Sequence, residues 1–497
     1  MSSTGRSNVA SSVQSAVAAL AALAAGFALS RAVPAVPFAP AALGDRIIRA
    51  TPGDVATLAI DRLGHAAQPL LELTLAAAFA GLGALLAIAR LGVAAGLFAI
   101  ATLAVGLLEP VQPSAPAAAA GAAVVGGTYA LARWWLERAS ATARAPVDPE
   151  RRRALAWMVA TTGLLLLASE PLGRLVRRWT AARAAPVARL PVRDRAPVRP
   201  PFPSVPGLSP EVTSVRDHYV VDIDLADPVV SAVGWRLEVG GLVARPVRLG
   251  FDELQQRFAL VEEISTLTCI SNRVGGPLAG CSRWLGVRLR DLLHAAGPRA
   301  GATALAVRCI DGYSVGVPLA AAMHPSALVA IAQDGQPLTR EHGFPCRLRL
   351  PALYGMMNPK WVQAIEVVDH AYRGYWQRQG WAQDAIVRTA SRIDTPRAAR
   401  VGQPTWIAGV AWAGVRGIAS VEVSTDGGAR WTPARLHQPL SPWAWTQWAV
   451  AWTPQRPGRH ELTCRATDGS GHPQDTRVRP PHPSGASGLH RVTVDVS

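Results

Sequence analysis

Five apolar runs rich in Ala, Leu, Val and Gly dominate the first part of the chain. They cover residues 13–33, 67–89, 91–108, 115–136 and 154–169. A helix needs about 20 apolar residues to cross a bilayer core, and ~17 is the lower bound. The pattern therefore predicts an amino-terminal bundle of about five transmembrane helices within residues 1–180, with the second and third runs paired as a hairpin at Arg90. The alternatives are four spans, or a bundle of buried helices in a soluble protein.

A different pattern follows residue 180. Residues 181–210 are rich in Pro, Arg and Val, which is typical of an extended linker. In residues 211–385, short apolar strands alternate with Gly and Pro turns and with brief helical patterns, which predicts a mixed α+β domain. The predicted elements are a strand at 235–239 and helices at 251–257, 289–296 and 318–322.

Residues 386–497 alternate apolar and polar positions over short segments separated by turn signals. Asp426-Gly427-Gly428 is typical of a hairpin turn. This pattern predicts an immunoglobulin-like β-sandwich. The Trp residues of this region are expected to pack inside the sandwich, and a ligand-binding face is the alternative.

Composition narrows the class of protein. Of the 497 residues, 49% are hydrophobic and 17% are charged, which excludes a disordered chain. Five cysteines are too few for a disulfide scaffold. The net charge is +16, and the excess of Arg gathers around the apolar runs. Arg at such places orients membrane helices, which accounts for the positive charge without a nucleic-acid surface. We therefore expect no nucleic-acid binding.

The distribution of Arg also predicts an orientation. Residues 109–116 contain no basic side chain, whereas Arg133, Arg138, Arg144 and the run Arg151-Arg152-Arg153 follow. The later segment is therefore expected in the cytoplasm, and the chain beyond the fifth run outside it. An Arg pair before an apolar run is also typical of a Tat export signal, here placed internally, with ordinary charge anchoring as the alternative. We expect a multi-pass cell-membrane protein whose carboxy-terminal half lies outside the cytoplasm.

The positions of the histidines indicate whether the chain could hold a haem. His65 is the one histidine before His218, and the sequence contains no Cys-x-x-Cys-His. A haem held by two histidines and a c-type haem are therefore not expected in this chain.

Cys269 is the most distinctive of the cysteines. It follows a run of small and β-branched residues and precedes the polar stretch Ile-Ser-Asn-Arg-Val-Gly-Gly. This pattern predicts a thiol at the end of a strand, facing a loop where a metal or a substrate can approach. A buried structural cysteine is the alternative. The spacing of the five cysteines fits no zinc pattern.

Three separated segments resemble the sulfite oxidase family of molybdopterin oxidoreductases. They are TCISNRVGG, RWLGVRLRDLL and LVAIAQDGQPLTREHGFPCRLRLPALYGMMNPKWVQAIEVV. The resemblance begins near residue 215 and extends through the sandwich. It implies a molybdopterin domain followed by the immunoglobulin-like domain that this family uses for dimerisation, so a homodimer is a further expectation.

The same resemblance implies the residues of a site. Cys269 would be the thiolate ligand of a molybdenum that is also bound by the two dithiolene sulfurs of one pterin. Asn272 and Arg273 match the Asn-Arg pair after the ligand cysteine, and Arg273 is a second candidate catalytic residue. Asp311 matches the aspartate at the amino edge of the pterin, and His342 and Arg347 match the pair on its phosphate side.

Three further residues complete the implied cofactor site. Asn358 and Lys360 match the loop that ends in the family's Lys-Trp motif. Lys360 is the single lysine among 50 basic residues, which suggests that a compact ammonium is required there. Tyr219 lies where the family has an aromatic segment that touches the cofactor, and core packing is the alternative.

Two departures from the family concern the substrate. Sulfite oxidases carry a second Arg after the Asn-Arg pair and a Tyr before the NG-x-PL motif, whereas Val274 and Ile331 stand here. The resemblance thus implies oxygen-atom or two-electron transfer on a small substrate, but it does not support sulfite. It also implies an external electron partner, either a quinone or a separate cytochrome. One alternative is a membrane-tethered binding protein whose enzyme-like domain holds no metal. Another is a transporter, for which Glu72 is the candidate intramembrane charge.

Overall fold

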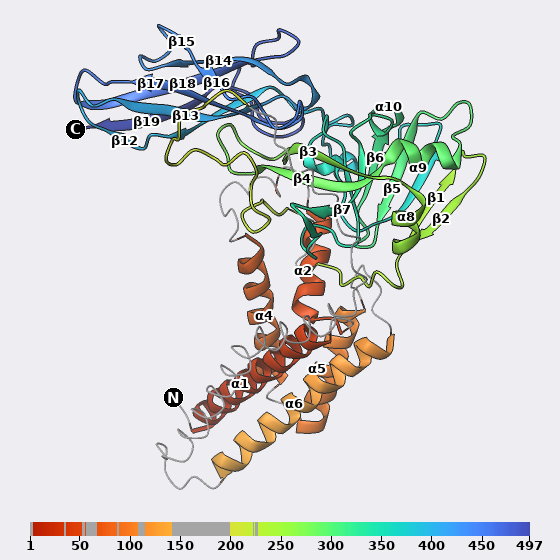
Figure 1. Cartoon of the computed structure of the whole chain (residues 1–497). Helices are drawn as coiled ribbons and strands as arrows, with labels where there is room; N and C mark the ends of the chain where they lie inside the picture. Colours follow the sequence, from red (N-terminus) through yellow and green to blue (C-terminus); the bar gives the residue numbers. More distant parts are fainter. Residues whose placement is uncertain are drawn as a thin grey trace. The chain divides into compact units, whose positions relative to one another are not determined.

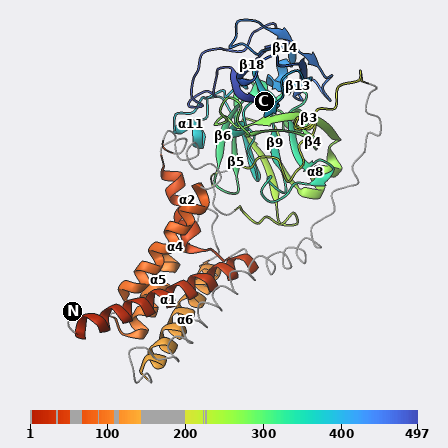
Figure 2. The same ribbon diagram turned by 90° about the vertical axis from the view of Figure 1, so that its left-hand side faces the viewer.

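A computed structural model describes residues 3–33, 36–51, 55, 67–86, 89–107, 115–141, 199–221, 223 and 227–497. The chain divides into two units. The amino-terminal unit contains Met1–Ala184 and Ile223–Val229, and the carboxy-terminal unit contains Ala185–Asp222 and Val230–Ser497. Figures 1 and 2 show the helices of the first unit and the strands of the second.

The amino-terminal unit is helical. Its described helices are α1 (Ser3–Ala32), α2 (Ala39–Ala50), α4 (Ala67–Leu85), α5 (Leu91–Gly106) and α6 (Ala115–Ala141). Helix α1 packs against α4 and α6, and α5 packs against α6 (Figure 1). Small side chains such as Ala18, Ala22 and Ala94 are buried at these contacts and let the helix axes approach closely.

Long side chains on α6 hold the bundle together. The Tyr129 ring stacks on Phe98 of α5 with 4.9 Å between centroids, and its hydroxyl donates to the carbonyl oxygen of Gly83 at 3.0 Å. The buried Arg133 guanidinium donates to the carbonyl oxygens of Leu86 and Ala89, both at 2.9 Å. It thereby binds two carbonyl oxygens just beyond the carboxyl end of α4, one of which, that of Leu86, also accepts from the N–H of Ala89.

The helices confirm part of the membrane prediction and correct part of it. Four apolar runs are helical, but α4 and α5 make few contacts with each other, so the predicted hairpin is wrong. Among the described helices, one segment, Ala115–Arg138, is long and apolar enough to cross a membrane, and Gln14–Ser30, Leu70–Leu85 and Leu91–Gly106 are shorter. The described residues therefore do not support a five-span bundle. The fifth run, the Arg151-Arg152-Arg153 segment and His65 lie outside the described residues.

Two sheets build the first part of the carboxy-terminal unit. One has the order β2-β1-β10-β5-β6, and the other has the order β3-β4-β7-β8, with β9 also paired to β7. The strands of the first sheet are β1 (Arg236–Gly241), β2 (Val247–Gly250), β5 (Ala304–Cys309), β6 (Ser314–Pro318) and β10 (Val362–Val368). Those of the second are β3 (Leu260–Thr268), β4 (Ala279–Arg288), β7 (Leu328–Gln333), β8 (Gln336–Pro337) and β9 (Arg347–Arg349).

Short helices connect these strands much as the sequence predicts. They are α8 (Phe251–Arg257), α9 (Leu289–Ala296), α10 (Leu319–Ala322) and α11 (Tyr375–Arg378). Helix α9 buries Leu289, Leu292, Leu293 and Ala296 along one face and ends at Gly297, which has a positive φ of 69°. The α+β character of this part is confirmed. The described residues between 199 and 235 contain no strand, although the sequence predicts short strands throughout residues 211–385.

The last part of the chain is a sandwich of two sheets (Figure 1). One sheet has the order β11-β13-β17-β16, and the other has the order β12-β19-β18-β14-β15. The strands are β11 (Ala390–Thr395), β12 (Ala398–Ala399), β13 (Thr405–Trp412), β14 (Ile418–Ser424), β15 (Thr432–Pro433), β16 (Arg435–Leu436), β17 (Thr446–Trp452), β18 (Gly458–Asp468) and β19 (His490–Val496). Both sheets contribute to its core, which includes Ile407, Val423, Trp448, Leu462 and Val494. The predicted hairpin turn joins β14 to β15.

Candidate functional site

Cys269 occupies the predicted position, immediately after β3. Its side chain is buried at 7% exposure, and its backbone N–H donates to the carbonyl oxygen of Leu278 at 3.0 Å. The Sγ atom lies 3.0 Å from the Ser271 hydroxyl oxygen. Burial raises the pKa of the thiol, because the surroundings disfavour the thiolate, and the Ser271 hydroxyl partly offsets this effect. A cation bound at Sγ would reverse that balance.

Tyr219 and His218 bring a second segment to the site. The Tyr219 hydroxyl is buried without a hydrogen-bond partner, and burial together with the nearby Cys269 thiol raises its pKa well above the ordinary value. A Cβ placed on Gly355 would lie 2.8 Å from this hydroxyl and 3.6 Å from the Cα of Cys269. Tyr219 therefore lies beside Cys269, as the resemblance implies.

His218 is a residue of the site that sequence reasoning missed. It is 3% exposed, its ring stacks on Tyr219, and its Nε2 atom has no partner. Burial, aided by the neighbouring His342, lowers its pKa to about 3, so the ring is neutral at physiological pH. Its place next to Tyr219 in the sequence was the available signal.

His342 faces His218 from the loop before β9. The two rings meet edge to face with 5.6 Å between centroids, and Nε2 of His342 lies 3.0 Å from the carbonyl oxygen of Val215. Burial lowers the pKa of His342 to about 4. Two neutral imidazoles thus adjoin each other, and each can donate or accept a hydrogen bond without adding charge.

Two buried guanidinium groups lie over one indole ring. Arg347 and Arg349, on alternate positions of β9, have their Cζ atoms 5.3 Å and 5.0 Å from the ring centroid of Trp284. Arg347 donates to the carbonyl oxygens of His342 and Asn358, at 3.2 Å and 3.0 Å. Burial lowers the pKa of Arg347 to about 10 and that of Arg349 to about 9. Arg347 is a site residue predicted from the sequence, whereas Arg349 and Trp284 were not predicted.

Asn358 has a structural role in the loop before β10. Its Oδ1 accepts hydrogen bonds from Arg349 and from the backbone N–H of Leu350, and its Nδ2 donates to the carbonyl oxygens of Leu353 and Tyr354. These four bonds use the amide fully. Asn358 therefore orients Arg349 and shapes the loop, and its side chain has no free group to offer a cofactor.

Lys360 lies at the rim of this region. Its Nζ donates to the carbonyl oxygen of Glu341 at 2.9 Å and lies 4.2 Å from the ring centroid of Trp361. Asp311 is buried on the turn between β5 and β6, where Oδ1 accepts from the N–H of Tyr313 at 3.0 Å. Both carry polar atoms beside the segments that the resemblance assigns to the pterin.

The loop after Cys269 separates the two residues of the Asn-Arg pair. Asn272 is buried, and its Oδ1 accepts from the N–H of Leu278 at 3.0 Å, which closes the loop. Arg273 is exposed. The structure therefore places Asn272 as a support of the loop that follows Cys269 and does not bring the Arg273 side chain into the buried cluster.

The site contains buried polar atoms that need partners. The side-chain atoms without a hydrogen-bond partner include His218 Nε2, the Tyr219 hydroxyl, Arg347 Nε and Arg349 Nε. For Arg347 and Arg349 in the described chain, the acceptors are carbonyl, hydroxyl and amide oxygens, and no carboxylate balances their charge. Buried groups of this kind are costly when unpaired, so the cluster suits a polar anionic ligand.

A metal at Cys269 would need ligands that the chain does not supply. In the part of the chain that the structure describes, no group of three His, Cys, Asp or Glu side chains could hold a metal ion. A pterin would bring two sulfur ligands of its own and so could complete the coordination of a metal held by one thiolate. The phosphate of the pterin would suit the two guanidinium groups. The residues present therefore fit a molybdopterin.

Comparison with known proteins gives the same answer. The model for an oxidoreductase molybdopterin binding domain matches residues 224–376, and the model for a Mo-co oxidoreductase dimerisation domain matches residues 382–480. Sulfite oxidase of Gallus gallus is 29% identical over 319 residues, covering 54% of this chain and 68% of that protein. The chain spans about half the length of the mammalian sulfite oxidases it matches.

A bacterial relative and a solved structure extend the comparison. The uncharacterized oxidoreductase YuiH of Bacillus subtilis is 32% identical over 151 residues, which are 30% of this chain and 72% of that protein. The sulfane dehydrogenase SoxCD from Paracoccus pantotrophus shares the fold, with a TM-score of 0.51 and 23% identity over 63% of this chain and 94% of that one. The chain therefore belongs to the molybdenum-cofactor oxidoreductases of the sulfite oxidase type.

Proposed function

We propose that this protein is a membrane-anchored molybdopterin oxidoreductase that carries out oxygen-atom or two-electron transfer on a small extracytoplasmic substrate. The observation that carries the proposal is the buried cluster beside Cys269, in which two uncompensated guanidinium groups and unpartnered His and Tyr atoms converge. Such a cluster is stable when an anionic polar ligand completes its hydrogen bonds.

The chain's own residues would divide the work. Cys269 would be the protein ligand of the metal, and the bound molybdenum would supply two-electron redox chemistry. Arg347, supported by His342, would bind the anionic side of the pterin, and Asp311 would accept hydrogen bonds from its amino edge. Arg349 adds positive charge behind Arg347. The neutral imidazoles of His218 and His342 would position polar groups without adding positive charge.

Two residues of this chain disfavour sulfite as the preferred substrate. Ile331 is fully buried in β7 at the position where sulfite oxidases have a Tyr, and Val274 follows Arg273 in place of a second Arg. Both replacements remove polar groups that an anionic substrate would use. We therefore propose a small substrate of lower charge, tested by turnover with artificial electron donors and acceptors on sulfite, on sulfoxides and on N-oxides.

The apolar amino-terminal helices support the membrane anchor. Helix α6 has the required length and hydropathy, and α1, α4 and α5 add shorter apolar segments. We propose that this unit holds the enzyme in the cell membrane with the catalytic unit outside the cytoplasm, and that electrons pass to an external quinone or cytochrome. Alkaline phosphatase fused after Ser497 should be active, whereas activity of a cytoplasmic reporter at the same place would overturn the orientation.

The proposed dimer rests on the match of residues 382–480 to a Mo-co oxidoreductase dimerisation domain. Light scattering of the detergent-solubilised protein, corrected for bound detergent, should give twice the mass of one chain. A monomeric mass across the working concentration range would contradict the dimer.

The decisive experiment is elemental analysis of the purified full chain, together with release of the pterin as its fluorescent oxidised derivative. We expect about one molybdenum and one pterin per chain, as one thiolate site requires. Cys269→Ser should lose turnover and most of the metal, while the cofactor-free forms of variant and wild type should share one thermal unfolding midpoint. An active variant would remove Cys269 from the metal. Folded wild type without molybdenum, from a host that makes the cofactor, would favour the alternative of a metal-free binding protein.

A further inference from the structure

The strand that leads to Cys269 lies at the edge of its sheet, and the sandwich covers that edge. In the order β3-β4-β7-β8, strand β3 is paired on one side. On its other side, the N–H of Thr266 donates to the carbonyl oxygen of Trp443 at 3.0 Å, and the N–H of Trp445 donates to the Thr266 hydroxyl at 2.8 Å. The Ser441 hydroxyl also donates to the carbonyl oxygen of Ile264. The segment before β17 thus binds β3 three residues before Cys269.

The sandwich also holds the loop that follows Cys269. Arg392 of β11 donates through Nη1 to the carbonyl oxygen of Gly276 at 3.0 Å, and its other nitrogens bind Asp394 and Ser209 at 2.7 Å and 2.8 Å. Gly275 has a φ of 75°, and a Cβ there would lie 2.1 Å from the ring of His490. The loop therefore lies directly against β11 and β19, with no space between them.

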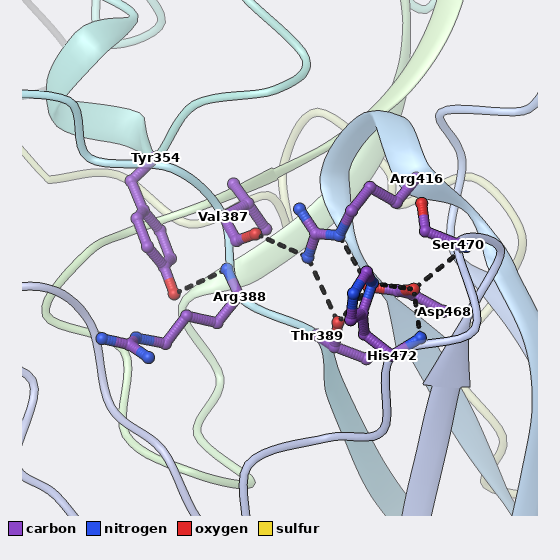
Figure 3. A network of polar contacts seen from close by, with 8 residues as sticks. All are labelled: Tyr354, Val387, Arg388, Thr389, Arg416, Asp468, Ser470 and His472. Atoms are coloured by element: carbon purple, nitrogen blue, oxygen red, sulfur yellow. Dashed lines mark hydrogen bonds and ion pairs between the residues drawn. The ribbon is translucent and has the colours of Figure 1, made fainter.

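A third contact reaches the wall opposite Cys269. This wall is the loop 350–358, where Gly355 approaches both Cys269 and Tyr219. Its Tyr354 hydroxyl accepts from the N–H of Arg388 at 3.2 Å, and a Cβ on Gly485 would lie 2.4 Å from that hydroxyl (Figure 3). The backbones are joined as well, because the N–H of Tyr354 donates to Ala385 at 2.9 Å and the N–H of Val387 donates to Ala352 at 3.0 Å.

The segment that contacts this wall, residues 385–389, is hydrogen-bonded to the sandwich. Arg416 donates through Nη2 to the carbonyl oxygen of Val387 at 3.0 Å and to the Thr389 hydroxyl at 3.1 Å. Its Nε binds the Asp468 carboxylate at 2.7 Å, and Thr389 binds the same carboxylate at 3.0 Å (Figure 3). The buried Asp468 carboxylate is thereby connected to the wall of the site. Arg416 links it to Val387, and the next residue, Arg388, donates to the Tyr354 hydroxyl.

We propose that the immunoglobulin-like domain positions the metal ligand, with Arg392 and Tyr354 as positioning residues that hold the loops on either side of Cys269. This role is separate from dimerisation, since all of these contacts lie within one chain. It rests on the proposed function in so far as Cys269 binds the metal. Groups around a ligand that restrict its orientation tune the metal it holds, so the domain influences the reaction without contacting the substrate.

The first test measures the thiol itself, in the full chain prepared without cofactor. N-ethylmaleimide labels Cys269 under native conditions, and peptide mass spectrometry follows its rate with fully buried Cys281 as the internal standard. Arg392→Met and Tyr354→Phe should each raise the labelling rate of Cys269 by about tenfold, because each removes the side-chain hydrogen bond to a loop beside Cys269 and so favours local opening. Arg465→Met, which removes the Arg465–Glu422 pair of the same domain, should not change it.

The second test uses the loaded enzyme at matched molybdenum content. The electron paramagnetic resonance signal of the half-reduced metal should shift its g-values in Arg392→Met and Tyr354→Phe, and Arg392→Lys should restore the wild-type signal in part. Tyr354→Phe keeps the ring and removes one hydroxyl, so it tests the proposal even where Arg392→Met does not fold.

The outcomes separate this inference from the proposed function. Unchanged labelling of Cys269 in both variants, or an equal rise at Cys281, would show that the domain contributes general stability and would overturn the inference. Identical g-values in the loaded variants would do the same. Absence of molybdenum from the wild type would contradict the proposed function, while the labelling rates would still decide whether the domain holds Cys269.

Discussion

Arg347 and Arg349 show how a binding pocket can be costly to its own fold. Burial lowers both pKa values, which means that the folded protein disfavours the charges it holds. The indole of Trp284 and several carbonyl oxygens compensate in part. An anion that completes the hydrogen bonds would stabilise the pocket further, so loading and stability are expected to rise together.

Arg347→Met should therefore separate ligand binding from stability. We expect the variant to bind the pterin about tenfold more weakly and to release it on dilution, because one guanidinium contact to a phosphate is worth about one factor of ten or more in affinity. The thermal midpoint of the cofactor-free protein should move by less than about 3 °C, since a disfavoured charge is removed along with its hydrogen bonds. Full pterin content in the variant would exclude Arg347 from the anion site.

His218 and His342 predict how stability depends on pH. Their pKa values are lowered to about 3 and about 4 from 6.5, so the unfolded chain binds more protons than the folded one below pH 6.5. Stability should therefore fall as the pH drops from 6.5 towards 4, by up to about 3 kcal/mol for His342 alone. Thermal midpoints of the cofactor-free protein at pH 7 and pH 5 test this. His342→Gln should reduce the difference, and His472→Gln, an exposed control, should leave it intact.

At the scale of single elements, the loop 350–358 depends on one amide. Asn358 makes four side-chain hydrogen bonds, which join the loop backbone to Arg349 and through it to β3. These bonds hold the loop on both sides of its one regular element, the 3-10 turn η3 (Gly355–Met357), and Gly355 of that turn lies next to Cys269.

Asn358→Ala should destabilise the carboxy-terminal unit by about 3 kcal/mol, because buried donors and acceptors lose their partners. The thermal midpoint should then fall by about 8 °C. Gln455→Ala, which removes one exposed hydrogen bond to Thr453, is the control and should have almost no effect. A drop of less than about 2 °C for the Asn358 variant would show that the loop is held by its backbone alone.

The elements that sequence could predict are those with local signals. The run before Cys269 predicts β3 because it contains β-branched residues and a Gly pair follows shortly after it. Helix α9 is predicted by the spacing of its apolar residues and by Gly297 at its end. Helix α2 was missed, since its short amphipathic pattern lies between two longer apolar runs. Arg349, Trp284 and His218 could not be joined into one cluster from the sequence, because their proximity depends on pairing between strands far apart in the chain.

At the scale of the whole molecule, Asp468 connects the two parts of the carboxy-terminal unit. Burial raises its pKa, but the hydrogen bonds from Arg416, His472, Thr389 and Ser470 outweigh this effect, so the net pKa is lowered. Its contribution to stability is therefore complete above the ordinary pKa of 3.8 and is lost as the pH falls further.

Asp468→Asn should lower the thermal midpoint at pH 7 by about 5 °C, because a buried charge-assisted pair becomes a weaker neutral contact. The difference between variant and wild type should shrink below pH 3.8, where the wild-type carboxylate also becomes neutral. Asp369→Asn, at an exposed carboxylate, is the control. An equal midpoint for variant and wild type at pH 7 would mean that Arg416 acts through Val387 and Thr389 alone.

The contact between Gly275 and His490 also bears on the order of synthesis. The segment around Cys269 leaves the ribosome more than 200 residues before β19, whose His490 ring lies directly against Gly275 in the folded chain. During translation the loop after Cys269 therefore lacks this neighbour, and we expect stable cofactor binding only after the sandwich has folded. A truncated or misfolded sandwich would leave an empty enzyme, so acquisition of the cofactor reports that the whole carboxy-terminal unit has been made correctly.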